Sequence, residues 1–434
     1  MNTNILDYGA QKNSTSLSTN AIQAAIDACA ASGGGRVTVP AGTYVSGTVW
    51  LADNVELHLA HDSVIKASGD LDDYNTEDAY PQNFSSRINE KWLGKHLIIA
   101  HECKNVAITG TGTLDGNGAH FFSEPEFYSA YVWRAGVRTA KDEEICRPGQ
   151  LVCFIECQNV RVEGINVTNQ PCWGIFFHGC EQVSVRALHT KNDPTFFNSD
   201  GIDIDCCRFV TVSDCVIDTG DDCIAIRGAE KKLGSGSRPC EFVTVTNCVL
   251  GSSSNAISLG VGTGNIRHVR ISNITITRAA PALTLQSSYH GRGSVSIEDV
   301  EVTNVSAKNC ARVFEILEGA NVPIKNVTLN NWSVETDGYF SLNSDFPDSV
   351  SDVTLKNFRI KMTDGPKPTI PRDLERKGRS WFRAKNIGSL HLEGFSVLDD
   401  GDFLSAWEDG IFSFEGCKDL STAKISVNSK EYTI

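Results

Sequence analysis

Short segments in which apolar and polar residues alternate recur along the chain. Each reads Val-x-Val or Val-x-Ile, and the first valines of the clearest copies are Val160, Val183, Val210, Val243, Val269 and Val295, with weaker copies around Val106, Val327 and Val353. Alternation with a period of two predicts β-strands, and a second short strand follows many copies after an Asn or Asp turn. The clearest valines are 23, 27, 33, 26 and 26 residues apart, which is typical of repeats that bury their apolar faces against their neighbours.

Two or three short strands per repeat, with no helix between them, leave a right-handed parallel β-helix as the simplest closed path. The predicted fold class is therefore all-β, a single-stranded solenoid of this kind. A propeller or a sandwich is the alternative. Propeller blades need about 40 residues or more, so the observed interval is too short for that architecture.

A length of 434 residues would by itself suggest two or three domains. A solenoid grows along one axis, however, so we predict a single β-helix domain over residues 1–434. About 1–35 would form an N-terminal strand and a capping helix, and about 36–430 the turns, with loop insertions near 117–147 and 229–239 that rim a groove.

The capping helix is predicted over Ser18 to Ala31, before Gly33-Gly34-Gly35. Apolar residues recur there at helical spacing, namely at Ala21, Ile22, Ala25, Ile26 and Cys29. Such a helix would cover the apolar end of the stack.

Charge and cysteine content narrow the setting. The formal net charge of −14 and a pI near 5.2 make nucleic acid and anionic membrane surfaces poor partners. The N-terminus has no signal-peptide pattern and no stretch of 18 apolar residues occurs, so we expect a cytoplasmic protein. Its fifteen cysteines lack metal-type spacing, which predicts reduced, buried thiols rather than a metal site. We expect no metal and no cofactor. Cys153 and Cys157 alternate on a strand, which favours packing over a metal pair.

Three carboxylates carry the candidate chemistry. Asp200 follows Asn198-Ser199, and the pair Asp221-Asp222 follows Gly220, so Asp200 and Asp221 are 21 residues apart. If that interval is one turn of the solenoid, all three lie on one face. Glycoside hydrolysis needs one protonated and one ionised carboxyl beside the bond, and crowding of like charges raises the pKa of one of them. Asp203 and Asp218 fit turn or structural roles better.

These residues also carry a resemblance to a known family. The run Asn198-Ser199-Asp200-Gly201-Ile202-Asp203, followed by Asp218-Thr219-Gly220-Asp221-Asp222-Cys223, resembles the active-site signature of the polygalacturonases, glycoside hydrolase family 28. Further similar stretches are Asp7-Tyr8-Gly9-Ala10, Val39-Pro40-Ala41-Gly42-Thr43-Tyr44, Gly110-Thr111-Gly112-Thr113-Leu114-Asp115-Gly116 and Pro171-Cys172-Trp173. The resemblance extends to about residue 310.

The resemblance implies a right-handed β-helix enzyme that hydrolyses an α-linked sugar polymer or oligomer with inversion. By position, Asp221 would protonate the leaving oxygen, while Asp200 and Asp222 would hold and deprotonate the attacking water. Spacing alone leaves the stereochemistry open, because adjacent turns lie about 4.8 Å apart whereas an inverting pair is separated by roughly 6.5 to 9.5 Å.

The chain departs from the family pattern at two places. Asn255 stands where the family has the His of a Gly-His-Gly motif. One turn on, Leu283-Thr284-Leu285-Gln286-Ser287 replaces the Arg-Ile-Lys that grips the galacturonate carboxylate, and Arg359-Ile360-Lys361 lies several turns beyond the site. The sugar at the cleaved position is therefore open between galacturonate and a neutral or differently placed acidic sugar.

Further residues are candidates for substrate contacts in the groove. Arg227, Tyr289, His290 and Arg292 offer positive or aromatic groups, and Asn198, Asn255 and Gln286 offer amides. His178 and Trp173 are also candidates, although packing is the more frequent role of such residues. The expected partner is an oligosaccharide, with the oligomeric state open.

Two other hypotheses remain at this point. A β-helix polysaccharide lyase could use clustered aspartates to bind Ca²⁺, and a catalytically altered carbohydrate-binding relic would explain the missing His and Arg-Lys. If the chain is a cytoplasmic hydrolase, exo-action on imported short oligosaccharides is expected rather than random cutting of polymers.

Overall fold

The computed structural model describes residues 1–81, 91–122, 147–229, 233–289, 291, 293–364 and 376–432. These residues fall into two compact units. Unit 1 is the described chain up to Asp221 together with 233–238, and unit 2 is 222–229 together with the described chain from Pro239 onward. The single domain predicted for 1–434 stays a prediction.

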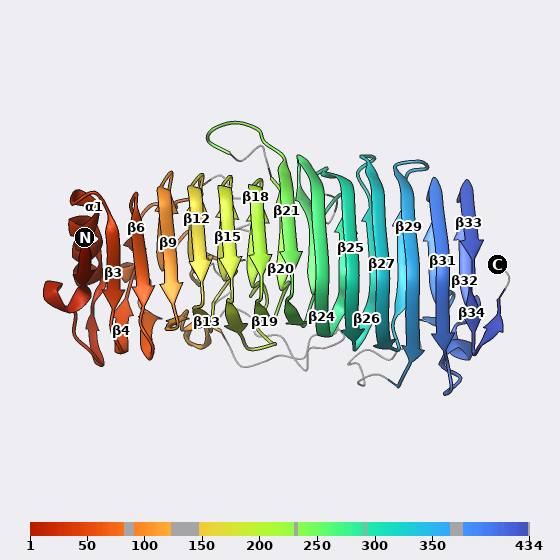
Figure 1. Cartoon of the computed structure of the whole chain (residues 1–434), viewed down its shortest axis with the longest axis horizontal. Helices are drawn as coiled ribbons and strands as arrows, with labels where there is room; N and C mark the ends of the chain where they lie inside the picture. Colours follow the sequence, from red (N-terminus) through yellow and green to blue (C-terminus); the bar gives the residue numbers. More distant parts are fainter. Residues whose placement is uncertain are drawn as a thin grey trace. The chain divides into compact units, whose positions relative to one another are not determined.

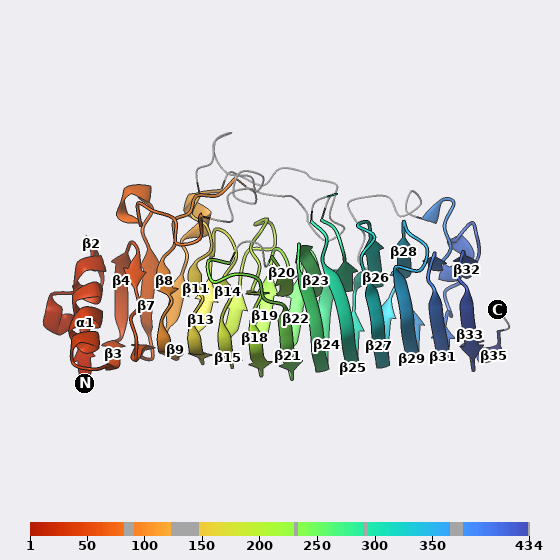
Figure 2. The same ribbon diagram turned by 90° about the horizontal axis from the view of Figure 1, so that it is seen from above.

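Unit 1 begins with the predicted capping helix. Helix α1 (Thr19–Ala31) buries Ala21, Ile22, Ala25, Ile26 and Cys29, the side chains that the sequence pattern selects. It contacts β1 (Asn2–Asn4) and β3 (Gly35–Val39), and Figure 2 shows it beside β3. The helix therefore covers the apolar end of this unit's strand stack.

The strands of unit 1 stack in three parallel columns (Figure 1). The first column continues from β3 through β6 (Val55–Leu59), β9 (Lys104–Gly110), β12 (Gln158–Glu163), β15 (Glu181–Arg186) and β18 (Arg208–Ser213). The second contains β2 (Ser14–Leu17), β4 (Gly42–Ser46), β7 (Ser63–Ala67), β10 (Thr113–Asp115), β13 (Asn166–Thr168), β16 (His189–Lys191) and β19 (Val216–Thr219). The third contains β5 (Val49–Trp50), β8 (Ile98–His101), β11 (Val152–Ile155), β14 (Ile175–His178) and β17 (Ile202–Asp205).

Unit 2 also has three columns of strands, several of them longer than those of unit 1. Its first two columns are formed by β21 (Cys240–Thr246), β22 (Val249–Ser252), β24 (Asn265–Gln286), β25 (Ser296–Lys308), β27 (Ile324–Thr336), β29 (Val350–Met362), β31 (Ser389–Leu398), β33 (Asp419–Ala423), β34 (Ser426–Val427) and β35 (Lys430–Glu431). Its third column contains β20 (Ile224–Gly228), β23 (Ile257–Gly262), the end of β24, β26 (Cys310–Glu318), β28 (Tyr339–Ser344), β30 (Phe382–Lys385) and β32 (Phe412–Glu415). Short 3-10 helices are η1 (Ile5–Tyr8), η2 (Leu71–Asp73), η4 (Gly118–His120) and η6 (Phe403–Ala406).

This architecture is the predicted right-handed parallel β-helix, all-β apart from the capping helix among the described residues. Connections between parallel strands of one sheet are right-handed in about 98% of cases, because a right-twisted strand packs back onto its sheet only that way. Among the described residues no helix is long and apolar enough to cross a bilayer.

The turns are held by an apolar interior and by polar ladders. In unit 2, Phe340 of the third column packs against Phe358 and Phe395 of the second, at ring-centroid distances of 5.7 and 6.0 Å. In unit 1, Asn105 Nδ2 donates to Asn54 Oδ1 at 2.7 Å, and the same contact recurs from Asn159 to Asn105. These three asparagines have a positive φ, a conformation that Asn tolerates better than most residues.

The strand register tests the repeat directly. Val160 pairs with Val106 and Val183, Val183 with Val210, and Val243 with Val269, as predicted. Val300, and not Val295, is the partner of both Val269 and Val327, so the copy assigned to Ser294-Val295 was wrong. Val295 is buried just before β25 begins, where an alternating pattern imitates the repeat.

The cysteines of the described residues are free thiols, and most are buried. Cys103, Cys157, Cys180 and Cys207 precede register-matched strands of the first column in unit 1. They pack as small apolar side chains inside the turns, which agrees with the prediction of reduced core thiols.

Candidate active site

Two of the three predicted carboxylates lie in unit 1. Asp200 immediately precedes β17 and is 5% exposed, and Asp221 follows β19. The backbone N–H of Asn198 donates to Asp221 Oδ2 at 2.9 Å. The segment that carries Asp200 therefore contacts Asp221, as the interval of one solenoid turn predicts.

Ser199 and Gly220 fix the approach of these two segments. Ser199 is fully buried, its hydroxyl donates to the carbonyl of Phe196 at 2.7 Å, and it accepts from the N–H of Gly220 at 3.1 Å. A Cβ on Gly220 would lie 2.2 Å from the Phe196 oxygen and 2.6 Å from Ser199 Oγ. Only glycine allows this contact, so the Gly before the paired aspartates is required by packing.

Arg147 anchors the side chain of Asn198. Its side chain is fully buried, and its Nη2 donates to Asn198 Oδ1 at 2.9 Å. The guanidinium also donates to the carbonyls of Lys91 and Phe197, each at 3.3 Å, and to the carbonyl of Pro171. It lies over the ring of Phe197 at 4.3 Å. Asn198 has a left-handed backbone, with φ 50°, and this anchoring stabilises the turn whose N–H binds Asp221.

The third carboxylate, Asp222, begins unit 2. Its Oδ1 accepts from Asn255 Nδ2 at 2.6 Å and from the Asn255 N–H at 3.2 Å, while its Oδ2 accepts from the Ser258 hydroxyl at 2.6 Å. Thr284 in turn donates to Asn255 Oδ1 at 2.8 Å. Hydrogen bonds of this kind favour the ionised form of a carboxyl group. Asn255 thus orients Asp222 with one end of its amide and is itself oriented through the other.

The outer side of the third column in unit 1 is covered by an aromatic cluster. Tyr80, Trp92, Trp173 and Phe176 pack there on Cys153, and each of these rings is at most 1% exposed. Trp92 and Trp173 have ring centroids 6.2 Å apart, and those of Tyr80 and Phe176 are 5.3 Å apart. We call these four rings the aromatic cluster.

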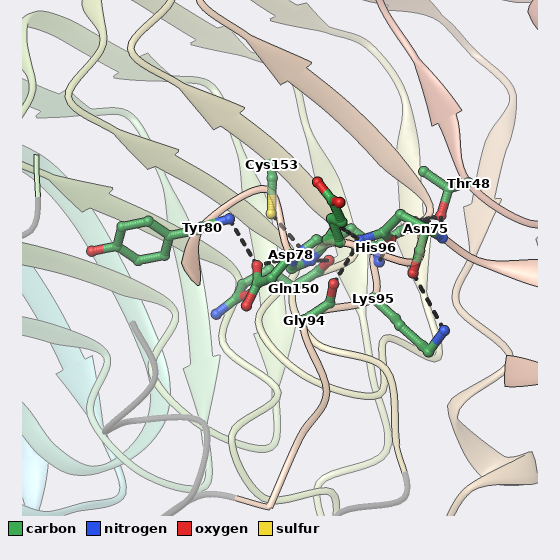
Figure 3. A network of polar contacts seen from close by, with 10 residues as sticks. Thr48, Asn75, Asp78, Tyr80, Gly94, Lys95, His96, Gln150 and Cys153 are labelled. Atoms are coloured by element: carbon green, nitrogen blue, oxygen red, sulfur yellow. Dashed lines mark hydrogen bonds and ion pairs between the residues drawn. The ribbon is translucent and has the colours of Figure 1, made fainter. Parts of the chain in front are cut away.

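A buried polar network holds the segments that carry Tyr80 and Trp92 of the aromatic cluster against the strands (Figure 3). His96 Nδ1 lies 2.8 Å from the carbonyl of Gln150, and its Nε2 lies 3.4 Å from Asp78 Oδ1. The N–H of His96 donates to Asn75 Oδ1 at 2.9 Å. Burial, together with the Asp78 carboxyl, raises the pKa of the nearby Cys153 thiol well above its usual value, so this Cys–His–Asp grouping is structural and not nucleophilic.

The other predicted contact residues differ in how far their side chains are exposed. Trp173 belongs to the aromatic cluster, and His178, 1% exposed, has its Nδ1 3.1 Å from Asp205 Oδ2. Arg227 lies on β20 and is 9% exposed, whereas Tyr289 is 39% exposed. Gln286 ends β24 opposite Gly260 and Leu317. His290, Arg292, most of 117–147 and part of 229–239 lie outside the described residues.

The two departures from the family pattern are one turn apart, as expected. Ser258 of β23 pairs with Thr284 of β24 in the third column of unit 2. Arg359 lies on β29 opposite Ser333 and Ser396, outside that column. Thr284 therefore lies one turn from Ser258, and Arg359 lies outside that column.

In unit 1, Asp200 precedes a strand of the third column and Asp221 follows one of the second, and in unit 2 Asp222 precedes a strand of the third column. The chain belongs to the family described as "Glycosyl hydrolases family 28", whose model matches residues 29–349, further than the motifs alone indicated. It is a polygalacturonase-like glycosidase, which sets aside both the lyase and the non-catalytic hypotheses.

Relatives of known activity support this assignment. The chain is 25% identical over 437 residues to the exo-poly-alpha-D-galacturonosidase of Dickeya chrysanthemi, covering 92% of this chain and 68% of that protein. It is 24% identical over 359 residues to the endo-polygalacturonase of Pectobacterium carotovorum subsp. carotovorum, covering 80% and 85%.

Solved structures agree. The exopolygalacturonase of Thermotoga maritima is 25% identical with a TM-score of 0.63, covering 85% of this chain and 88% of that one. The family 28 exopolygalacturonase of Yersinia enterocolitica is 21% identical with a TM-score of 0.67, covering 97% and 78%, and shows the fold alone.

Sequence reasoning missed three parts of the site. Arg147 ends the long insertion, which has no periodic pattern, and Ser258 is one of many serines on turns. The aromatic cluster joins residues far apart in the sequence. A fully buried arginine is rare unless it is paired or hydrogen-bonded, but burial is not visible in the sequence.

Proposed function

We propose that the chain is an inverting, exo-acting hydrolase of the α-glycosidic bonds of pectin-type oligosaccharides. The observation that carries this proposal is the support of Asp222 by Asn255 and Ser258, next in sequence to Asp221. Hydrolysis needs one ionised and one protonated carboxyl, and donors to Asp222 favour its ionised form.

In the proposed mechanism Asp221 is the general acid and Asp222, with Asp200, binds the attacking water. The N–H of Asn198 on Asp221 Oδ2 orients that carboxyl so that its other oxygen carries the proton toward the leaving glycosidic oxygen. Asp222 takes a proton from water as the C–O bond breaks. The attack comes from the face opposite the leaving group, so the anomeric configuration inverts.

Exo-action is supported by the aromatic cluster. In unit 1 the outer side of β11 and β14 is filled by its side chains, so a sugar chain has no room along that part of the column. The Dickeya relative is named an exo-poly-alpha-D-galacturonosidase, whereas the Pectobacterium relative is an endo-enzyme. The packed aromatic cluster favours exo-action.

A panel of oligogalacturonides and neutral pectic oligosaccharides, analysed by product chromatography, tests the proposal. Wild type should release a mono- or disaccharide from at least one acidic oligomer, and Asp221→Asn should lower the rate by more than about a hundredfold, as removal of a general acid does. Proton NMR of the first product should show the β-anomer. An α-anomer, or turnover retained in the variant, would refute the mechanism.

The mode of action needs a separate measurement. On polygalacturonate, an exo-enzyme releases reducing ends with little loss of viscosity. A rapid loss of viscosity at low hydrolysis would show endo-action and would contradict the part of the proposal that rests on the aromatic cluster.

A further inference from the structure

The outer face of the first column of unit 1 carries a pocket that the proposed mechanism does not use. It has a volume of about 620 Å³ and is lined by residues on or beside β1, β3, β6, β9 and β12. The last four of these strands lie side by side in Figure 1. Ligand pockets usually span about 300–1,000 Å³, so this one is large enough for a small ligand. It lies on a different column from the strands next to Asp200 and Asp221.

The pocket exists because one outward position of the column is small. Strand register aligns Arg36 with Glu56, Glu56 with Ala107, and Ala107 with Arg161. Three of these positions carry long side chains, whereas Ala107 carries only a methyl group and is 7% exposed. The face is therefore hollow above Ala107, with Glu56 on one side and Arg161 on the other.

Glu56 is held in one orientation inside the pocket. Its side chain is 19% exposed and forms a bidentate ion pair with Arg36, Nε to Oε2 at 3.0 Å and Nη2 to Oε1 at 3.2 Å. The Thr109 hydroxyl donates to the same Oε1 at 2.5 Å. Burial would raise the pKa of Glu56, but the hydrogen bonds from Thr109 and Arg36 lower it below its usual value. The carboxylate is therefore ionised and oriented before a ligand binds.

The charges around the pocket cancel. Arg161 closes it on one side, and the guanidinium of Arg161 is engaged by Glu56 at 3.5 Å and by Glu163 at 2.9 Å. Together with Arg36, two cations therefore face two carboxylates. This balance gives neither an anion nor a cation a net attraction, so it favours a neutral ligand.

Hydrogen-bonding groups of both kinds are available at the rim of the pocket. The side chains of Asn54, Asn105 and Asn159 form a ladder there, in which each amide donates to the oxygen of the one before it, at 2.7 and 2.8 Å. Within the part of the chain that the structure describes, Arg36 Nη1 donates no hydrogen bond and Asn159 Oδ1 accepts none. A hydroxyl group both donates and accepts, so a sugar can use both atoms.

We infer that this pocket is a second, non-catalytic saccharide site, which binds the hydroxyl groups of a neutral sugar unit in a pectic polysaccharide. Arg36, held by Glu56, and the asparagine ladder of Asn54, Asn105 and Asn159 supply the contacts. Their fixed orientation reduces the entropy lost on binding. The inference concerns binding away from the catalytic aspartates, so it stands apart from the proposed function.

The test is calorimetry with galactan oligosaccharides, which are neutral, and the Asp221→Asn protein, which prevents turnover. Arg36→Gln in that background should weaken the affinity about tenfold, equivalent to about 1.4 kcal/mol. An excess of oligogalacturonide, which occupies the catalytic site under the proposed function, should leave galactan binding unchanged. Absence of galactan binding by the Asp221→Asn protein would overturn the inference.

Two further variants separate binding from folding. Ala107→Leu fills the pocket and leaves the ion pairs in place, so it should abolish galactan binding without lowering the temperature of thermal unfolding. Arg36→Lys keeps a cation beside Glu56 and should preserve stability, but it lacks the planar fork and should not restore the affinity. Arg186→Gln, on β15 of the same column and outside the pocket, is the matched control and should bind as before.

The remaining outcomes are decisive as well. Unchanged galactan affinity in Ala107→Leu, or an equal loss in Arg186→Gln, would reject the site. A loss of oligogalacturonide affinity in Arg36→Gln, with galactan binding unaltered, would show an acidic ligand and overturn the assignment to a neutral sugar. Because binding is measured without turnover, failure of the proposed function would leave each of these results interpretable.

Discussion

The side-chain amide of Asn255 donates to Asp222, with Nδ2 2.6 Å from Oδ1. The same carboxylate accepts the Ser258 hydroxyl at its other oxygen, at 2.6 Å. Both of these side-chain donors are neutral, and their hydrogen-bonding capacity does not change with pH near neutrality. The acidic limb of the pH–activity profile should then reflect the titration of carboxylates rather than of an imidazole.

Ser258→Ala removes one of these donors. Asp222 must be ionised to accept a proton. With fewer hydrogen-bond donors its ionisation requires a higher pH, so the acidic limb of the kcat/KM profile should move to higher pH. A hydrogen bond to a charged group contributes about 1.5–3 kcal/mol, which corresponds to about one to two pH units. Ser341→Ala, on β28 of the same column and further from Asp222, is the control. An unmoved limb in Ser258→Ala would contradict the role of the hydroxyl.

Thr284→Val tests the support of Asn255 from the next turn. Without the donor to Oδ1, the amide can rotate and present oxygen to Asp222, so kcat should fall about tenfold with little change in KM, from the loss of roughly one hydrogen bond. Thr284→Ser restores the hydroxyl and should recover most of the rate. If the valine and serine variants behave alike, Thr284 acts by packing alone.

Arg147→Lys tests the anchor of Asn198. An ammonium cannot reproduce the planar set of donors to Asn198 and the surrounding carbonyls, so the free energy of unfolding should fall by about 2–4 kcal/mol. The rate should fall more than the affinity, because Asn198 positions Asp221. Arg161→Lys, at an exposed arginine of unit 1, should change neither quantity in thermal unfolding and initial-rate assays.

The fold was predictable because one periodicity determines it. Alternation at Val106, Val160, Val183 and Val210 places every second residue inside, and the register confirms these pairings. The error at Val295 arose because alternation just before β25 satisfies the same pattern. Val300, five residues later, occupies the repeat position, because it pairs with both neighbouring strands.

The three aspartates could be recognised from sequence, but their supports could not. Asn255 was placed at the position of the family's histidine and among the candidate substrate contacts, but its hydrogen bonds to Asp222 and Thr284 could not be read from the sequence. Arg147 reaches Asn198 across 51 residues. Such contacts depend on side-chain direction and burial, which a pattern with a period of two does not encode.

Trp92→Phe tests whether the aromatic cluster sets the mode of action. The smaller ring leaves space above β11, so the ratio of viscosity loss to reducing ends released should rise on polygalacturonate. Trp332→Phe is the control, because Trp332 stacks on Phe358 inside unit 2 and a similar loss of packing should lower stability without changing that ratio. An unchanged ratio in Trp92→Phe would show that the cluster does not determine exo-action.

Glu156 should make the anchoring of residues 233–238 depend on pH. Its Oε1 accepts from the N–H of Ser235 at 3.0 Å and from the Ser235 hydroxyl. Burial would raise the pKa of Glu156, but these hydrogen bonds, with the charges of His178 and Arg238, lower it below the usual value. A carboxyl with a lowered pKa contributes stability that is present above its ordinary pKa of about 4.3 and is lost as pH falls through the lowered value.

Hydrogen exchange of the amides in 233–238 measures this anchor. At neutral pH the wild type should exchange more slowly than Glu156→Gln, and the two should converge once the pH has fallen below the lowered pKa of Glu156, where its carboxyl becomes protonated. Comparing the proteins at each pH removes the intrinsic pH dependence of exchange. Glu163→Gln, whose carboxylate pairs with Arg161 at the surface, should match wild type throughout. A pH-independent difference between wild type and Glu156→Gln would mean that the shape of the side chain, and not its charge, holds the segment.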